Sequence, residues 1–337
     1  MRITKVSIMR LIILGCIIPF VLSTIVYYGF STNYTKGVFT KQGFEQLYGN
    51  GIYKYRVLGS SMLLKTYDLV EKFNLPILPH NEGDWKFYSA YFYLNTFFLC
   101  LTCITLFIVL GGLINNDFMA VDLPLMFMCC LMTITQYVVV PYDTLSYFFL
   151  SIAAFLILKN KQKVWEIIIL SIVVILATLT RETASLILAF YFAFNYKEIL
   201  KKTELFKINQ KQRELLIITL CFLCTYFGLR FALGFENGIY KEITLINITN
   251  ILSILSILFF VSIFILIVIT KVKTKETFIF LLATLPYTLA LLAISILWEI
   301  RLWVPVILLL LILKIPRSIN SPSSGMDNLS KIEDSLN

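Results

Sequence analysis

Three arginines and four carboxylates stand out in this chain, because they interrupt apolar runs or lie in the loops between them. The arginines and carboxylates are Arg56, Arg181, Arg301, Glu45, Asp143, Glu182 and Glu299. An ionisable group near the edge of a bilayer needs a polar cavity or a partner, so each is a candidate for function. A planar guanidinium suits a phosphate or diphosphate, and a carboxylate can accept the proton of a hydroxyl group. The set therefore predicts chemistry on a phosphate-containing substrate.

Most of these residues also have a purely structural interpretation. Asp143 stands at the expected start of a helix, where a carboxylate complements the helix dipole, so it is a candidate cap. Arg181 and Glu182 would also fit a tight turn between two helices. Glu299 and Arg301 would equally form a structural pair. The sequence leaves these alternatives open.

Two tryptophans, Trp298 and Trp303, flank the last of these pairs. Aromatic side chains gather as a belt at both interfaces of a membrane. The apolar face of an indole also stacks on a sugar ring. A membrane belt and a sugar-stacking platform are therefore both open for these two residues.

No metal site is predicted from the sequence. The 7 cysteines include two C-x-x-C pairs, but nearly all lie in apolar runs, and His80 is the only histidine. Structural zinc usually needs four ligands. The carboxylates would suit a divalent metal, but their spacing is not diagnostic, so no cofactor is assigned. The sequence also contains no Walker motif, Rossmann glycine fingerprint, nucleophile elbow or H-E-x-x-H motif.

The elements that must position these residues are membrane helices. Of the 337 residues, 58% are hydrophobic and only 15% are charged, whereas a soluble domain carries about 25% charged residues. A spanning helix needs about 20 mostly apolar residues, and about ten segments come near this requirement. These segments are 8–28, 89–113, 118–139, 143–158, 164–180, 184–197, 214–232, 250–270, 277–297 and 302–314. We predict an all-α, polytopic transmembrane bundle that forms a single domain over 1–317, with a disordered tail over 318–337.

The positions of the basic residues predict the orientation of the bundle. The net charge of +9 comes largely from lysines and arginines in alternate short loops, which the positive-inside rule assigns to the cytoplasm. Membrane topology explains this charge, so no nucleic-acid partner is predicted. Both termini are then cytoplasmic. The loops that carry the polar motifs all face outward: 29–88, 140–144, 179–183, 235–238 and 298–303.

The long first outer loop, 29–88, is expected to contain helices of its own. From 56 to 73 the apolar residues follow a helical stripe, with charged residues elsewhere around the helix. Such a helix either lies on the outer membrane surface or packs against the bundle, and both arrangements stay open. A second short helix is expected from 41 to 48.

These features resemble the bacterial GT-C membrane glycosyltransferases, which use polyprenyl-phosphate-linked sugars. The resemblance covers the architecture of most of the chain. The matching motifs are Tyr-Arg-Val-Leu at 55–58, Tyr-Asp-Thr-Leu at 142–145, Thr-Arg-Glu-Thr at 180–183 and Glu-Ile-Arg-Leu-Trp-Val-Pro at 299–305. It implies an enzyme of the bacterial cytoplasmic (inner) membrane that transfers a sugar from a polyprenyl-phosphate donor to a lipid-linked or glycan acceptor on the outer face.

The resemblance also assigns roles to individual residues. It implies that Glu45 is the catalytic base and that Arg56, Arg181 and Arg301 bind phosphate. Asp143 is a second candidate catalytic carboxylate. The family usually has an acidic residue soon after the first helix, whereas residues 31–44 contain neither Asp nor Glu. Glu45 is the nearest candidate, and it comes late in the loop.

Three other classes of protein remain open. A repeat-unit polymerase of the O-antigen or capsule type also combines outer arginines with lipid-diphosphate substrates, although its large loop typically lies later in the chain. A transporter or flippase would place polar residues at the middle of the membrane and often show internal repeats, neither of which is clear here. A non-catalytic membrane scaffold is the third alternative.

Overall fold

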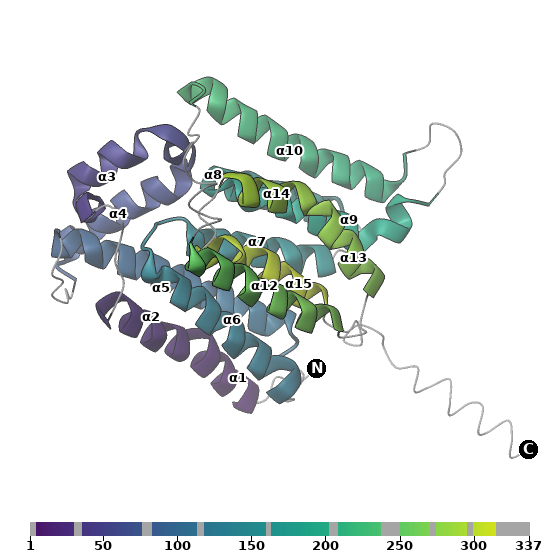
Figure 1. The fold of residues 1–337 in the computed structure, drawn as a ribbon, viewed down its shortest axis with the longest axis horizontal. Helices are drawn as coiled ribbons and strands as arrows, with labels where there is room; N and C mark the ends of the chain where they lie inside the picture. The colour runs from purple at the N-terminus through teal and green to yellow at the C-terminus, as the bar shows by residue number, and fades with distance from the viewer. Residues whose placement is uncertain are drawn as a thin grey trace, which may run out of the picture.

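The structure is a computed structural model in which every regular element is a helix, among the residues that it describes. Those residues are 5–29, 36–75, 83–112, 118–159, 163–201, 208–236, 250–269, 274–294 and 299–314. The helices run side by side along the length of the molecule and form one bundle (Figure 1). The predicted all-α class is therefore confirmed.

The first third of the chain builds one long helix and a group of short ones. The elements are α1 (Lys5–Ile12), η1 (Ile13–Ile17), α2 (Ile18–Gly29), η2 (Lys36–Phe39), α3 (Lys41–Tyr48), η3 (Gly51–Tyr55) and α4 (Val57–Phe73). Here α1, η1 and α2 form one uninterrupted helix of 25 residues. Helix α3 coincides with the helix predicted over 41–48, and α4 covers the helix predicted over 56–73 except for its first residue.

The remaining elements form the rest of the bundle. They are α5 (Trp85–Val109), η4 (Phe118–Asp122), α6 (Leu123–Ile134), η5 (Thr135–Tyr137), α7 (Asp143–Lys159), α8 (Val164–Thr180), η6 (Glu182–Ala184), α9 (Ser185–Ile199), α10 (Gln210–Leu233), α12 (Ile251–Ile269), α13 (Thr274–Ala283), α14 (Leu285–Ile294), η7 (Ile300–Leu302) and α15 (Val304–Leu313). Each of the ten apolar segments singled out in the sequence coincides with one of these helices or with a consecutive set of them.

Within the described residues, four helices are long and apolar enough to cross a membrane. They are Lys5–Gly29, Trp85–Val109, Phe118–Tyr137 and Gln210–Leu233, and a fifth results if α13 and α14, which meet at a 50° bend, count as one span. In length and composition these are the helices of an integral membrane protein. The larger number of about ten spans stays a prediction, because several other apolar helices are short.

The short helices end where the polar segments begin. Helix α7 starts at Asp143, α8 stops at Thr180 and α15 starts at Val304. The first two have 17 residues each, which at about 1.5 Å per residue is roughly 26 Å, against a hydrocarbon thickness of about 30 Å. These two helices are therefore slightly shorter than the hydrocarbon core of a bilayer is thick.

Helix α4 packs against the bundle through one face. Leu63 and Val70 are fully buried, and the ring of Tyr67 lies 5.1 Å from the ring of Phe87 on α5. The opposite side exposes apolar side chains, of which Phe73 is 62% exposed. The helix thus combines a packed face with an apolar outer side, and its position relative to a membrane surface stays a prediction.

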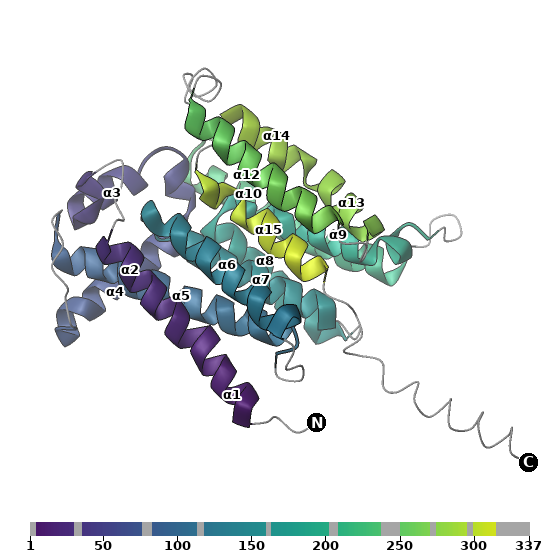
Figure 2. The same ribbon diagram turned by 60° about the horizontal axis from the view of Figure 1, so that its bottom comes forward.

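The two ends of the bundle differ in the elements that they carry. Helices α3 and α4 lie together at one end, whereas the beginning of α1 and the end of α15 lie at the opposite end (Figures 1 and 2). The end of α9 and the beginning of α10 also lie at that opposite end. The polar segments near α3 and α4 are therefore separated by the length of the helices from the beginning of α1 and the end of α15.

Candidate functional site

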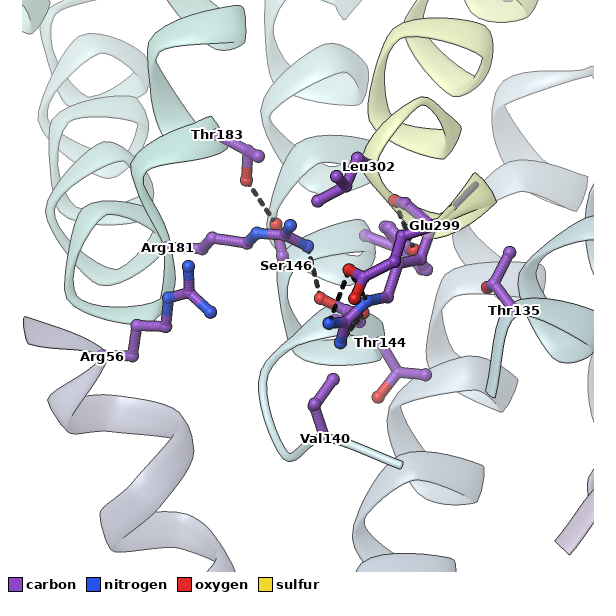
Figure 3. Close-up of polar contacts among 12 residues, drawn as sticks. Arg56, Thr135, Val140, Thr144, Ser146, Arg181, Thr183, Glu299 and Leu302 are labelled. Atoms are coloured by element: carbon purple, nitrogen blue, oxygen red, sulfur yellow. Dashed lines mark hydrogen bonds and ion pairs between the residues drawn. The ribbon is translucent and has the colours of Figure 1, made fainter. Parts of the chain in front are cut away.

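Polar segments from distant parts of the sequence meet at the end of the bundle near α3 and α4 (Figure 3). They are the turn before α4, the stretch between η5 and α7, the turn between α8 and α9, and η7 before α15. In each, an α-helix begins or ends and the chain continues in a turn or a short 3-10 helix. Such backbone is tolerated at membrane depth only where protein buries it or where it lines a polar cavity.

Asp143 lies at the centre of this cluster. Its side chain is completely buried, and its two oxygens take different partners: Arg181 Nη1 donates to Oδ1, and Arg301 Nη1 lies 3.4 Å from Oδ2. Arg301 also donates from Nε to Glu299 Oε2 over 2.9 Å. Two cations and two carboxylates thus neutralise one another, which buried charges require.

Arg56 approaches the cluster from the beginning of α4. Its guanidinium lies over the ring of Tyr142, 4.2 Å from the ring centre, and Arg181 approaches the same ring at 5.5 Å. A guanidinium over an aromatic face gains electrostatic stabilisation that grows when water is excluded. Arg56 is only 8% exposed. Tyr142 therefore brings two arginines together that would otherwise repel each other.

Glu182 connects this cluster to α10. Its Oε2 lies 3.6 Å from Arg56 Nε, and its Oε1 lies 3.7 Å from Arg230 Nη2. Burial disfavours the charged form of this carboxyl, but Arg56 and then Arg181 and Arg230 outweigh that effect and hold its pKa below the ordinary value. The Glu182 side chain keeps 34% of its surface exposed, so it is the carboxylate that opens toward solvent.

Arg230 is a member of this cluster that was not predicted from the sequence. It lies near the end of α10, in a helix of mean composition apolar enough to span a membrane. An arginine in such a helix is itself a signal of a polar partner, and that signal could have identified it. Arg230 covers Tyr226 at 3.6 Å and Tyr55 at 4.4 Å from the ring centres.

A buried polar network fixes the backbone next to Asp143. Asn95, in the middle of α5, donates to the Tyr27 hydroxyl at 2.6 Å and to the carbonyl of Val140 at 2.9 Å. Its own oxygen accepts a hydrogen bond from Thr144 at 2.7 Å. In an apolar medium each unsatisfied polar group would cost free energy, so this network holds the segment in one conformation. Asn95 was not predicted from the sequence, although an amide inside an apolar helix is a comparable signal.

A second group of contacts clasps the end of α10 to η3. Glu236 pairs with Lys54 and accepts from the backbone N–H of Gly51. The Tyr55 hydroxyl donates to the carbonyl of Gly234 at 2.7 Å and accepts from the N–H of Glu236 at 2.8 Å. Lys54, followed by the Gly51 N–H, lowers the pKa of Glu236. We call these residues the α10 clasp.

The other predicted residues have different surroundings. Glu45 is exposed on α3; one turn further along, the ring of Tyr48 lies 6.2 Å from that of Tyr142. Trp303 stacks on Phe260 of α12 at 5.1 Å, which favours packing within the bundle over an open sugar platform. Trp298 lies outside the described residues, and its role stays a prediction.

Each carboxylate of the cluster contacts an arginine. Among the described residues, no three His, Cys, Asp or Glu side chains come together in a way that would hold a metal ion. What the arrangement offers is a set of guanidinium groups with one partly open carboxylate. Such a set can bind and neutralise an anionic group.

Comparison with known proteins adds no relative: no family model, no curated protein and no solved structure matches this chain. The class of protein is therefore defined by the fold and the cluster alone. It is an all-helical protein with candidate membrane-spanning helices and an arginine-rich cluster set into one end of the bundle.

Proposed function

We propose that this protein is a membrane glycosyltransferase that moves a sugar from a polyprenyl-phosphate donor to a lipid-linked or glycan acceptor. One observation carries the proposal. Arg56, Arg181 and Arg301 come from three separate segments, and all three lie at one buried cluster with Asp143. Arg181 and Arg301 each have a carboxylate partner in this cluster, whereas the buried Nε of Arg56 has no hydrogen-bond acceptor among the described residues. Arg56 is therefore available to stabilise a phosphate leaving group.

The proposed reaction breaks the bond between the anomeric carbon of the sugar and the phosphate oxygen. A carboxylate accepts the proton of the acceptor hydroxyl, whose oxygen then bonds to the anomeric carbon. The bonding electrons leave with the phosphate. Its growing negative charge is stabilised by guanidinium groups in a site of low dielectric constant, where such interactions are strong.

The surroundings of the carboxylates favour different roles in this proposal. Asp143 and Glu299 are buried and paired with arginines, so they act as positioning residues. Glu45 is exposed and is close in the chain to Tyr48, whose ring contacts Tyr142. We therefore keep Glu45 as the proton acceptor. Replacing it by glutamine should lower turnover far more than donor binding.

The proposal includes a topology for the whole chain. About ten spans, with both termini in the cytoplasm, put the basic turns inside and the arginine cluster outside. Lipid-linked sugars and surface glycans meet on the outer face of a bacterial inner membrane. The cluster lies at the end of the bundle opposite the start of α1 (Figure 2), as this topology requires.

The test is the surface-glycan profile of cells that lack this protein, read by gel and by mass. Complementation should use Arg56→Gln, with Lys65→Gln as the matched control, because Lys65 is exposed on the same helix. Arg181 is a poorer choice, since its loss would leave Asp143 without its main partner. A ladder of normal length that lacks one sugar per repeat, restored by Lys65→Gln and not by Arg56→Gln, would support the proposal.

Other outcomes of this experiment separate the alternatives. A collapse of the ladder to a single repeat unit would indicate a repeat-unit polymerase instead of a transferase. An unchanged profile would count against both enzymes. Complementation by Arg56→Gln at full strength would remove this arginine from the reaction.

A further inference from the structure

The charges of the arginine cluster divide into an inner and an outer group. The inner group is Asp143, Arg181, Glu299 and Arg301, whose side chains are at most 9% exposed. It contains two cations and two carboxylates. The outer group contains two cations, Arg56 and Arg230, and only Glu182 as a carboxylate. The outer group therefore carries the excess positive charge.

The contacts within the outer group are long. Glu182 is 3.6 Å from Arg56 and 3.7 Å from Arg230, whereas charge-assisted hydrogen bonds are normally about 2.7–2.9 Å. Arg56 Nε is buried and has no hydrogen-bond acceptor among the described residues. A buried N–H group of this kind usually has a partner. Glu182 therefore satisfies the N–H groups of the two outer arginines only in part, and a stronger acceptor would satisfy them more fully.

Both outer arginines lie over the faces of aromatic rings. Arg56 lies over Tyr142, and Arg230 lies over Tyr226 and Tyr55. The N–H groups of a guanidinium point outward in its own plane. Arg230 Nη1 donates to the carbonyl of Tyr226 at 3.3 Å, whereas the buried Nε of Arg56 has no hydrogen-bond acceptor among the described residues. The rings thus hold two cations whose remaining N–H groups can take phosphate oxygens.

We propose that Arg56 and Arg230 form a phosphate-binding subsite in which a phosphate group displaces the side chain of Glu182. A phosphate offers more acceptor oxygens and more negative charge than one carboxylate, so it can satisfy both guanidinium groups. Glu182 then swings toward the solvent that it already reaches. The chemical class of the ligand is a phosphate monoester or a diphosphate, carried either by a lipid or by a soluble molecule.

The α10 clasp positions the two arginines of this subsite relative to each other. Arg230 lies on α10, whose end is tied to η3 through Lys54, Tyr55 and Glu236. Arg56 follows Tyr55 directly in the chain. One set of contacts therefore sets the separation between the two arginines. This subsite deepens the proposed function by assigning the phosphate of the donor to a pair that includes a residue of α10.

The experiment measures anion binding to the full-length protein in phosphatidylcholine nanodiscs. Inorganic pyrophosphate is the soluble probe, and nanodiscs that also contain a polyprenyl phosphate supply the lipid probe. Arg230→Gln should weaken binding by about tenfold or more, because a hydrogen-bonded charge contact is lost. Arg230→Lys, which keeps the charge but loses the planar fork, should have an intermediate effect. Lys65→Gln should bind like the unmodified protein.

The Glu182→Gln substitution distinguishes the two roles of Glu182 by the direction in which it changes phosphate affinity. If Glu182 occupies the place of the phosphate, its neutralisation should tighten binding several-fold. If Glu182 only supports the site, the same substitution should weaken binding. Weaker binding by Glu182→Gln, or unchanged binding by a folded Arg230→Gln protein, would overturn the subsite. Should Arg230→Gln fail to fold, the Glu182→Gln result decides alone.

The two probes identify the source of the phosphate, and the outcome is separable from that of the proposed function. Arg230-dependent binding of polyprenyl phosphate but not of pyrophosphate would support a lipid ligand, and the reverse would support a soluble one. Arg230-dependent binding without any change in surface glycans would sustain the subsite and reject the transferase. Glycan transfer by a folded Arg230→Gln protein that binds both probes normally would reject the subsite and sustain the transferase.

Discussion

At the scale of single residues, Asp143 shows how burial changes the value of an ion pair. Its carboxylate is completely buried and meets Arg181 and Arg301 through separate oxygens. Such a pair stabilises a fold little compared with an apolar replacement, but breaking it leaves a buried charge without compensation. The residue is therefore intolerant of change, whatever its role in chemistry.

We predict that Asp143→Asn destabilises the protein by about 3–5 kcal/mol, because two buried guanidinium groups then lose their shared anion. The measurement is the loss of folded monomer on heating in detergent, followed by gel filtration. Glu182→Gln is the matched control. Its carboxylate is partly exposed and its contacts are long, so it should cost below about 1 kcal/mol. Equal losses in the two variants would contradict this account of Asp143.

At the scale of elements, the approach of α4 to the stretch before α7 depends on Gly59. A Cβ atom at this position would lie 2.9 Å from Tyr142 Cβ and 3.2 Å from the carbonyl oxygen of Pro141. Those atoms belong to the backbone or stand next to it, so they cannot rotate away. The absence of a side chain at Gly59 therefore lets α4 bring Arg56 over Tyr142.

We predict that Gly59→Ala moves α4 away from Tyr142 and destabilises the protein by about 1–3 kcal/mol, as overpacking does. If Arg56 binds phosphate, affinity should fall in the same variant. Gly228→Ala on α10 is the control, since nothing lies within 4 Å of the added Cβ, and there the better helix propensity of alanine should leave stability equal or slightly higher. The measurement is the midpoint of thermal unfolding, and a Gly59→Ala midpoint as high as that of Gly228→Ala would refute the close approach.

The α10 clasp should respond to acid in a defined direction. Lys54 lowers the pKa of Glu236, so the contact stabilises the fold above the unfolded pKa of about 4.3 and is lost as the pH falls through the folded value. The melting temperature of Glu236→Gln should therefore lie below that of the unmodified protein at pH 7. The difference should disappear at a pH below the folded value, where both side chains are neutral. A difference that persists in acid would show that the Lys54 contact is not its cause.

At the scale of the whole molecule, different elements lie at the two ends of the bundle. The arginine cluster, α3 and α4 lie at one end, and the beginning of α1 lies at the other (Figure 1). Lys163 and Lys197, next to the turns at that other end, are exposed. The predicted orientation would put these two lysines on the cytoplasmic side, as the positive-inside rule describes.

Cysteine labelling should detect this orientation. In a background without the native cysteines, Glu45→Cys and Lys65→Cys should react with a membrane-impermeant maleimide on intact cells. Lys163→Cys and Lys197→Cys should react only after the cells are opened. Reaction of the Lys163→Cys protein on intact cells would overturn the predicted topology.

Helix positions were determined by the sequence itself, because apolar runs and their breaks are local properties of the chain. Over their described residues, the ten apolar segments and the helices predicted over 41–48 and 56–73 coincide with helices in the structure, the last of them starting at residue 57. The same local signals placed Arg56, Asp143, Arg181 and Arg301 at helix ends, where they are found. Patterning along the chain contains this information since each helix forms its hydrogen bonds within one segment.

Only the tertiary structure decided which charges meet. The sequence offered Glu299 as a partner for Arg301, but it contained nothing to indicate that Asp143 binds Arg181 and Arg301 together. Arg230 and Asn95 joined the site through the packing of α10 and α5. Partners of this kind depend on how helices cross and on the depth at which they end, which no local pattern specifies. The local signals therefore located the charged helix ends, and the packing of the helices made them one cluster.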